Sequence, residues 1–225
     1  MNTVKEFYDQ LQFPGKYTIA GLDYHSPEIR NPYLKIIDDH LCNGISVLDV
    51  GCGTGLITNL FARRYNSQFV GVDFADSVDY AQQFALHNCI SNVEFKKQDF
   101  LSSTFDSQYD VVICQGVLHH ITDHVHAANN LNALIRPGGK LILGVYHPWG
   151  KLLKKLITIN YHDDILRQDQ ELHPYETSFT PDQISKLFPD FCIVDSYPKN
   201  FININAIINS RNGGLTTYIL EKNNV

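Results

Sequence analysis

Apolar runs of β-branched residues alternate with amphipathic runs through the middle of the chain, and a glycine or an acid marks most of the changes. The apolar runs predict strands, and residues recurring at helical spacing predict the helices between them. The expected strands are 47–50, 68–73, 92–100, 109–116 and 141–146, and the expected helices are 56–65, 77–88 and 121–135. Such alternation is typical of a parallel, doubly wound α/β sheet.

The pattern changes on both sides of this core. Before it, Pro32 begins a predicted helix, and an aromatic-rich stretch precedes that helix. After it we expect a helix at 149–159, a polar stretch, a helix opened by Thr180 and Pro181, and two antiparallel strands at 191–196 and 215–220. The chain 1–225 is therefore predicted to be a single domain: an N-terminal cap (1–42), a core (43–148), a cap insertion (149–179) and a C-terminal helix with strands (180–225).

Residues 47–55 read Val-Leu-Asp-Val-Gly-Cys-Gly-Thr-Gly and carry the clearest functional signal. The first predicted strand ends in glycines at 51, 53 and 55, and an amphipathic helix follows at once. Glycine lets the backbone reach positive φ and lets a ligand approach the main chain closely. The helix N-terminus directs bare N–H groups into the same space. This turn is therefore suited to a small polar ligand.

Two details of the sequence narrow the choice of ligand class. The dinucleotide fingerprint requires a glycine at position 56, where this chain has Leu56, and Asp49 lies inside the strand, where a pyrophosphate gains nothing from a carboxylate. A ligand that carries an α-amino group suits that acid better. The segment resembles motif I of the class I S-adenosylmethionine (SAM) methyltransferases, (D/E)-x-G-x-G-x-G, and Asp49, Gly51, Gly53 and Gly55 match it position by position.

The remaining strands extend the resemblance over roughly residues 40–148. The second and third strands end in acids, and a Pro-Gly-Gly turn precedes the fifth. The resemblance implies a Rossmann-like seven-stranded, mostly parallel sheet with the last strand antiparallel, and SAM as cofactor. It implies ribose binding by Asp73, adenine binding by Asp99, and a strand-four segment at the methionine end. The cofactor-binding residues expected on this basis are Asp49, Gly51, Cys52, Gly53, Gly55, Asp73, Phe74, Asp99, Phe100 and Gln115.

The reaction implied is methyl transfer from SAM to an O, N or C nucleophile of a small molecule. A general base is needed only if the nucleophile is protonated. The candidates are His147, His173, His119 and Tyr146, and His147 leads because it directly follows the last parallel strand. We expect the caps, through Tyr17, Tyr24 and Glu176 as well as His147 and His173, to control the acceptor and not the cofactor.

Four histidines fall within residues 119–126, and His120 and His124 have the spacing of a metal pair on a helix. No acid or cysteine stands at an obvious ligand spacing, so we expect no metal and instead expect His119 or His120 to touch substrate. Two other functions stay open. The chain could bind SAM without transferring its methyl group, or it could be an NAD(P)-dependent reductase, against which Leu56 and Asp49 argue.

Composition adds limits. Eighteen basic residues against 24 acidic ones give a net charge of −6, and the basic residues are scattered, so no nucleic-acid partner is expected. The five cysteines have no C-x-x-C spacing, which is typical of reduced thiols. No apolar run approaches the ~18 residues needed to span a membrane, and no secretory pattern opens the sequence. We therefore expect a cytoplasmic monomer or homodimer.

Overall fold

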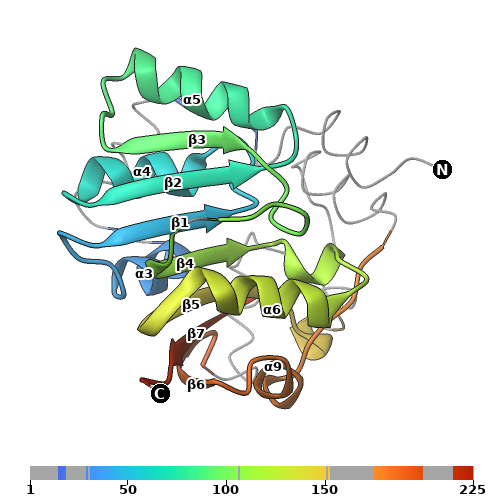
Figure 1. Cartoon of the computed structure of the whole chain (residues 1–225). Coiled ribbons are helices and arrows are strands. Elements are labelled where there is room, and N and C mark those ends of the chain that lie inside the picture. The colour runs from blue at the N-terminus through green and yellow to red at the C-terminus, as the bar shows by residue number, and fades with distance from the viewer. Residues whose placement is uncertain are drawn as a thin grey trace.

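The computed structural model describes residues 15–18, 29, 31–105, 107–150, 152, 175–199 and 215–224. In this part of the chain seven strands form one sheet with helices on both faces (Figure 1). The strands are β1 (Ser46–Val50), β2 (Gln68–Asp73), β3 (Val93–Lys97), β4 (Tyr109–Gln115), β5 (Ile135–Tyr146), β6 (Phe191–Tyr197) and β7 (Leu215–Lys222). The helices are α3 (Pro32–Asp38), α4 (Leu56–Arg64), α5 (Ser77–His87), the 3₁₀ turn η1 (Leu118–His120), α6 (His124–Leu134) and α9 (Pro181–Leu187).

The sheet has the order β3-β2-β1-β4-β5-β7-β6. Strands β1 to β5 run parallel, and β7 is antiparallel to both β5 and β6. The predicted fold class is therefore confirmed. The chain order reverses between β1 and β4, and in open α/β sheets ligands bind beyond the carboxyl ends of the strands at such a switch point. We call the side where β1–β5 end the carboxyl edge and the opposite side the amino edge.

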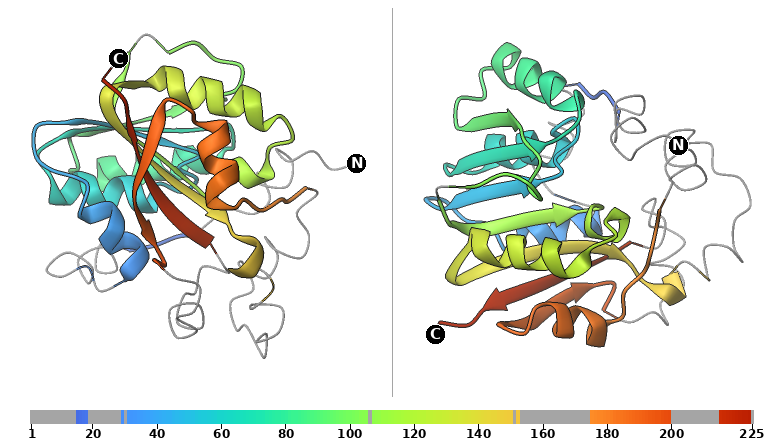
Figure 2. Two further views of the ribbon diagram at one scale, coloured as in Figure 1. Left: turned by 90° about the horizontal axis from the view of Figure 1, so that it is seen from below. Right: turned by 45° about the vertical axis from the view of Figure 1, so that its right-hand side comes forward.

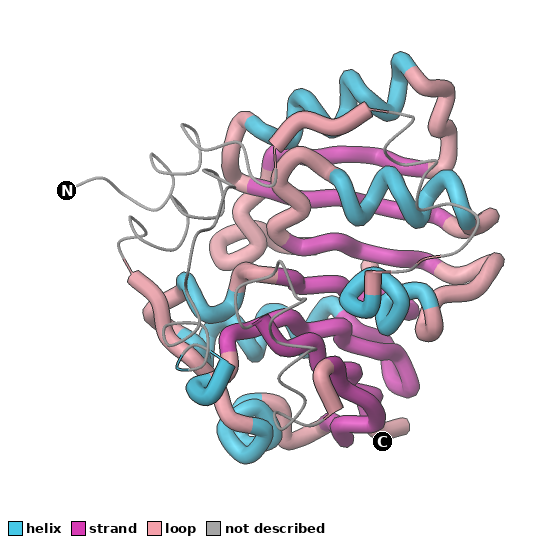
Figure 3. Tube along the Cα trace, turned by 180° about the vertical axis from the view of Figure 1, so that it is seen from behind, coloured by secondary structure: helices cyan, strands magenta, loops and turns pink. Residues whose placement is uncertain are grey.

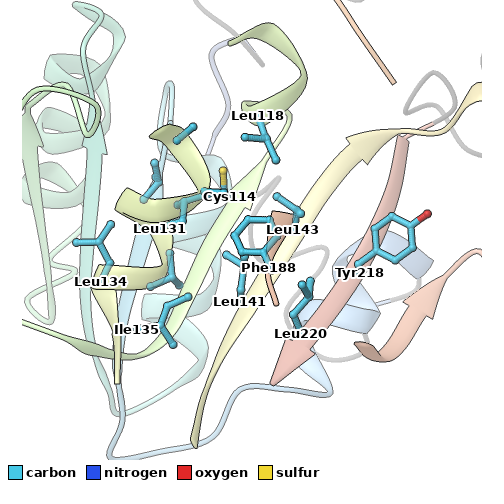
Figure 4. Close-up of a cluster of buried hydrophobic side chains, with 14 of the residues drawn as sticks. Cys114, Leu118, Leu131, Leu134, Ile135, Leu141, Leu143, Phe188, Tyr218 and Leu220 are labelled. Atoms are coloured by element: carbon cyan, nitrogen blue, oxygen red, sulfur yellow. The ribbon is translucent and has the colours of Figure 1, made fainter. Parts of the chain in front are cut away.

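Strand residues alternate between two apolar layers, because successive side chains point to opposite faces. One face packs against α3, α4 and α5, which lie in front of the sheet in Figure 3. The other face packs against α6 and α9, and Figure 4 shows Leu131 and Leu134 of α6 and Phe188 beside the strand residues Leu141 and Leu143. With apolar side chains on both of its faces, the sheet gives the loops at its carboxyl edge a rigid support.

Three predicted boundaries are wrong. Strand β5 begins at Ile135 and not at 141, because Ile135 pairs with Tyr109 and the Pro-Gly-Gly segment continues the strand, with Gly138 at φ +71°. Helix α6 begins at His124 and not at 121, because the Asp123 side chain accepts the His126 N–H and thereby caps the helix. Strand β3 ends earlier than expected, so Asp99 lies in the turn that follows it.

The C-terminal helix was predicted with its cap. Thr180 and Gln183 form a reciprocal capping box at the start of α9, and Pro181 is its first residue. The predicted N-terminal cap and cap insertion lie mostly outside the described residues; their described parts are 15–18, 29, 31–42, 149–150, 152 and 175–179. Within the described chain, no helix has the length and apolar character required to cross a membrane.

Side chains near the amino edge form hydrogen bonds and ion pairs with one another. Asp110 at the start of β4 accepts hydrogen bonds from the Ser46 N–H (2.7 Å) and hydroxyl (2.8 Å), and forms an ion pair with Arg136. On the neighbouring helices, Arg64 pairs with Asp38 at 2.6 Å, which joins α4 to α3. The hydrogen bonds and charge around Asp110 hold its pKa below the ordinary value, although burial alone would raise that pKa.

Candidate active site

The glycine loop, residues 51–55, joins β1 to α4 at the carboxyl edge. Its glycines have φ values of +70°, +55° and +76°. A Cβ atom at Gly51 would collide with Val117, and one at Gly55 would lie 2.6 Å from the Ala81 side chain. The outer glycines are thus required by packing as well as by backbone conformation. The central one, Gly53, directs its N–H to the carboxylate of Asp73 at 2.8 Å.

Asp73 connects two loops at the carboxyl edge. Its Oδ2 accepts the Gly53 N–H, and its Oδ1 accepts the Ala75 N–H at 2.8 Å. Each carboxylate oxygen can accept more than one hydrogen bond. Ribose binding by Asp73 stays a prediction. The structure adds a role that the sequence pattern did not indicate, which is to hold the glycine loop.

Asp49 lies beneath the loop and is only 2% exposed. Its Oδ2 accepts the Thr58 hydroxyl at 2.6 Å, in the first turn of α4. Burial raises the pKa of Asp49 to about 7; the Thr58 hydrogen bond opposes the rise and the nearby charge of Asp73 adds to it. Within the described residues no lysine or arginine pairs with this acid.

The expected adenine-binding residues lie in the turn after β3 and the loop after β2. Asp99 Oδ1 accepts the Leu101 N–H at 2.9 Å and Oδ2 accepts the Ser102 hydroxyl at 3.1 Å, so this carboxylate organises its own turn. Phe100 is buried in the apolar layer beneath α6, whereas Phe74 is half-buried. Phe74 therefore has more surface to offer a ligand than Phe100. Cys52 is buried within the glycine loop, and burial raises the pKa of its thiol.

The end of β4 borders open space. Gly116 has φ +78°, and a Cβ atom there would meet no atom of the described residues within 4 Å. Gln115, just before it, turns back over the sheet: its Oε1 accepts the Thr217 hydroxyl at 3.3 Å and the side chain lies over Gly144. The next residue, Val117, packs against Gly51. The loop after β4 and the glycine loop are therefore neighbours, and Gly116 leaves room beside them.

Three of the four predicted catalytic side chains are buried near the ends of β4 and β5. The His119 ring lies 4.2 Å from Tyr146 and 4.1 Å from His120, between ring centroids, and His147 follows Tyr146 in sequence. The structure thus brings His119, His120 and Tyr146 together. His173, the fourth candidate, lies outside the described residues.

Hydrogen bonds indicate which nitrogen of two histidines carries the proton. His120 Nδ1 lies 3.1 Å from the Tyr175 carbonyl oxygen and must therefore donate, which leaves the lone pair on Nε2 when the ring is neutral. His147 Nδ1 accepts the Trp149 N–H at 3.2 Å, which favours the proton on Nε2. Burial lowers the pKa of His147, so the ring is neutral at physiological pH. Adjacent histidines look alike in sequence, so reasoning from the sequence did not rank His120 as the base.

Residues 175–179, the end of the predicted cap insertion, run beside this histidine cluster. The Thr177 N–H donates to the His119 carbonyl at 2.9 Å, and the Phe179 N–H donates to the Tyr146 carbonyl at 2.8 Å. His124 packs its ring edge-on to Phe179 at 4.9 Å. No group of three His, Cys, Asp or Glu in the described residues is placed to hold a metal ion.

A parallel α/β sheet with a glycine loop and an acid after its second strand defines a class of nucleotide-type ligand-binding domains. A family model described as "Methyltransferase domain" matches residues 41–188. The chain belongs to this methyltransferase family. It is 37% identical over 111 residues to a ubiquinone biosynthesis O-methyltransferase of Coxiella burnetii, which is 48% of this chain and 47% of that protein. The chain thus spans about half the length of the curated relatives it matches. An uncharacterised methyltransferase of Schizosaccharomyces pombe is 32% identical over 169 residues, covering 67% of this chain and 57% of the relative.

Solved structures agree on the fold. An N-methyltransferase of Bradyrhizobium japonicum, solved with S-adenosylhomocysteine, superposes with a TM-score of 0.64 at 13% identity and covers 99% of both chains. A magnesium protoporphyrin IX methyltransferase of Synechocystis, also solved with S-adenosylhomocysteine, gives 0.63 at 19% identity over 96% of this chain and 93% of that one.

Proposed function

We propose that the protein is a SAM-dependent methyltransferase that acts on an O, N or C atom of a small-molecule acceptor. The observation that carries the proposal is the bond between the Gly53 N–H and Asp73 Oδ2, beside the buried acid Asp49. It joins the glycine loop to the acid after β2. The chain's place in a methyltransferase family supports the same assignment.

The residues at the carboxyl edge fit SAM chemically. SAM carries a sulfonium and an ammonium group, and the acids Asp49 and Asp73 supply the negative potential that would attract them. The Asp73 carboxylate would accept the ribose hydroxyls, and Phe74 would contact adenine. The open space at Gly116 leaves room for the methionine portion beside the glycine loop.

When bound, SAM supplies a methyl group activated by its positive sulfur, so the protein has to align the acceptor with it and exclude water. We assign acceptor alignment to the cluster of His119, His120 and Tyr146, and to His147, which follows Tyr146 in sequence. His120 Nε2 would take the proton from a protonated nucleophile, because its Nδ1 is committed to the Tyr175 carbonyl. His147 would instead donate a hydrogen bond through Nε2.

The acceptor atom stays open in this proposal. The names of the relatives include an O-methyltransferase and those of the solved neighbours an N-methyltransferase. A small molecule is favoured over a nucleic acid because the net charge is −6 and basic residues are scattered.

The reductase alternative finds little support. A reductase of this kind would need a Tyr-x-x-x-Lys catalytic pair. The one such spacing in the sequence, Tyr218 to Lys222, lies on strand β7, where residues four apart are separated by about 13 Å. Lys222 Nζ donates to the carbonyls of Asn132 and Ile135 at 2.8 and 2.7 Å. Tyr218 and Lys222 therefore cannot act together as a proton-transfer pair.

The test is incubation of the protein with a cell extract and SAM labelled in its methyl group. The proposal expects label in a small-molecule product together with an equal amount of S-adenosylhomocysteine. SAM binding without either product would instead identify a binding protein that lacks transferase activity. Label in nucleic acid or protein alone would overturn the acceptor class.

A further inference from the structure

Tyr17 lies against the glycine loop, and not with the acceptor cap where its sequence position suggested. Its hydroxyl donates to the Thr54 carbonyl oxygen at 2.9 Å. In return the Thr54 hydroxyl donates to the Gly15 carbonyl oxygen at 3.0 Å. Thr54 is fully buried and stands between Gly53 and Gly55. Two hydrogen bonds therefore join a short segment before α3 to the centre of the loop.

A third group completes a chain of hydrogen bonds. Asn59 on α4 is fully buried, and its Nδ2 donates to the Tyr17 hydroxyl oxygen at 2.8 Å. The Tyr17 oxygen thus accepts from Asn59 and donates to Thr54. Burial holds the pKa of Tyr17 above its ordinary value, so the phenol keeps the proton it donates.

Helix α5 holds the Tyr17 backbone from the other side. The Tyr80 hydroxyl accepts the Tyr17 N–H at 3.1 Å and donates to the Tyr17 carbonyl at 2.8 Å. The Tyr17 ring packs on Phe84 at 4.5 Å. Residues 15–18 are the short blue segment beside α5 in the right-hand view of Figure 2. Tyr17 is fixed independently of the loop and can therefore act on it as a brace.

We propose that Tyr17 is a positioning residue for SAM binding: by fixing the Thr54 carbonyl it holds the glycine loop in the conformation that places the Gly53 N–H on Asp73. The inference rests on the proposed function. Without the brace, the glycine loop would adopt its binding conformation in only a fraction of the molecules. The apparent affinity for SAM would then be reduced in proportion to that fraction. By linkage, bound SAM in turn stabilises the contact of residues 15–18 with the loop.

The test is Tyr17→Phe, which removes the hydroxyl and keeps the ring on Phe84. We expect SAM to bind five- to tenfold more weakly by calorimetry, with kcat at saturating SAM within twofold of wild type. Hydrogen exchange should become faster at the Gly53 and Gly55 amides of the unliganded protein. Tyr80→Phe, which loosens the Tyr17 backbone without touching the loop, should weaken SAM binding by about two- to threefold.

Tyr65→Phe is the matched control. The Tyr65 hydroxyl donates to Asp38 at 2.7 Å at the other end of α4, so its loss should lower stability and leave SAM affinity and loop exchange unchanged. Wild-type affinity in Tyr17→Phe, or equal weakening in Tyr65→Phe, would overturn the brace. If the wild-type protein does not bind SAM, the proposed function itself fails, so the two failures are distinguishable.

Discussion

Two strand carboxylates, Asp110 and Asp49, differ in their hydrogen-bond partners and in the direction of their pKa shifts. At the amino edge, Asp110 receives two hydrogen bonds from Ser46 and the charge of Arg136, and its pKa is lowered. Toward the carboxyl edge, Asp49 on the neighbouring strand receives one hydroxyl, and burial raises its pKa to about 7. Both acids lie in strands, yet of the two only Asp110 has a basic partner among the described residues.

This difference in pairing indicates which edge of the sheet binds a ligand. An uncompensated buried carboxylate costs folding free energy, and proteins tolerate such a cost at functional sites. The described residues around Asp49 supply no cation, whereas the SAM we propose there carries two cationic groups. The amino edge joins strands and helices through hydrogen bonds and ion pairs, and we propose that the carboxyl edge binds the cationic ligand. Paired substitutions at the two edges test whether they differ in this way.

The largest effect is expected from a side chain at the centre of the glycine loop. Gly53→Val imposes a β-branched residue at φ +55° next to the Asp73 contact. We expect SAM affinity to fall by about a hundredfold or more, to below detection by calorimetry, while circular dichroism reports a folded protein.

Gly44→Val is its control at the amino edge. Gly44 also has positive φ, at +81°, and within the described part of the chain a Cβ atom there meets nothing within 4 Å. This variant should lose stability to backbone strain and bind SAM normally. If both variants bind equally well, the loop is merely a structural turn.

Removal of the acid after β2 comes next. Asp73→Ala deprives ligand hydroxyls and the Gly53 N–H of their acceptor, so SAM binding should weaken by about 2–4 kcal/mol. Asp110→Ala should instead lower the melting temperature and keep SAM affinity. Titration of the two folded variants decides the point, and unchanged affinity in Asp73→Ala would remove the ribose assignment. Asp99→Ala should weaken binding less, since apolar contacts also hold adenine.

A pH effect follows from Asp49. The unfolded chain releases this proton near pH ~4, whereas the folded protein holds it up to about 7. Between these values the folded state binds more protons, so its stability falls as the pH rises and the contribution is lost above about 7. Asp49→Asn cannot release a proton and should therefore be more stable than unliganded wild type by roughly 4 kcal/mol at pH 8, because about three pKa units at ~1.4 kcal/mol each separate the folded and unfolded states. Its advantage should vanish near pH 4, and denaturant melts across pH measure it. A constant difference would contradict the raised pKa.

The smallest change in SAM affinity is expected at the histidines that we assign to acceptor alignment. His120→Ala and His147→Ala should keep SAM affinity within about threefold, a difference below ~1 kcal/mol. Each should slow methyl transfer to the identified acceptor by about tenfold or more, since the proton acceptor or the aligning donor is lost. His40→Ala, which removes an amino-edge partner of Asp195 at 3.7 Å, should turn over normally. Wild-type rates in both site variants would exclude the two histidines.

The strands and the glycine loop of the core were largely predictable from the sequence. Glycines and acids mark the strand ends there, and the unit of β1, glycine loop and α4 is local in sequence. The boundary at 135 was missed because Pro137 and Gly138 are typical of turns, yet tertiary pairing with β4 extends the strand through them. The brace formed by Tyr17 was also missed, because its partners stand 37 to 63 residues away and no pattern records such contacts. The proton positions on His120 and His147 likewise depend on backbone groups of Tyr175 and Trp149.

Calorimetric titration of the wild-type protein shows whether the carboxyl edge of this sheet binds SAM. We expect saturable one-site binding of SAM and no heat of binding with NAD under the same conditions. Binding of NAD in place of SAM, or of neither ligand, would mean that SAM is not the ligand of this site.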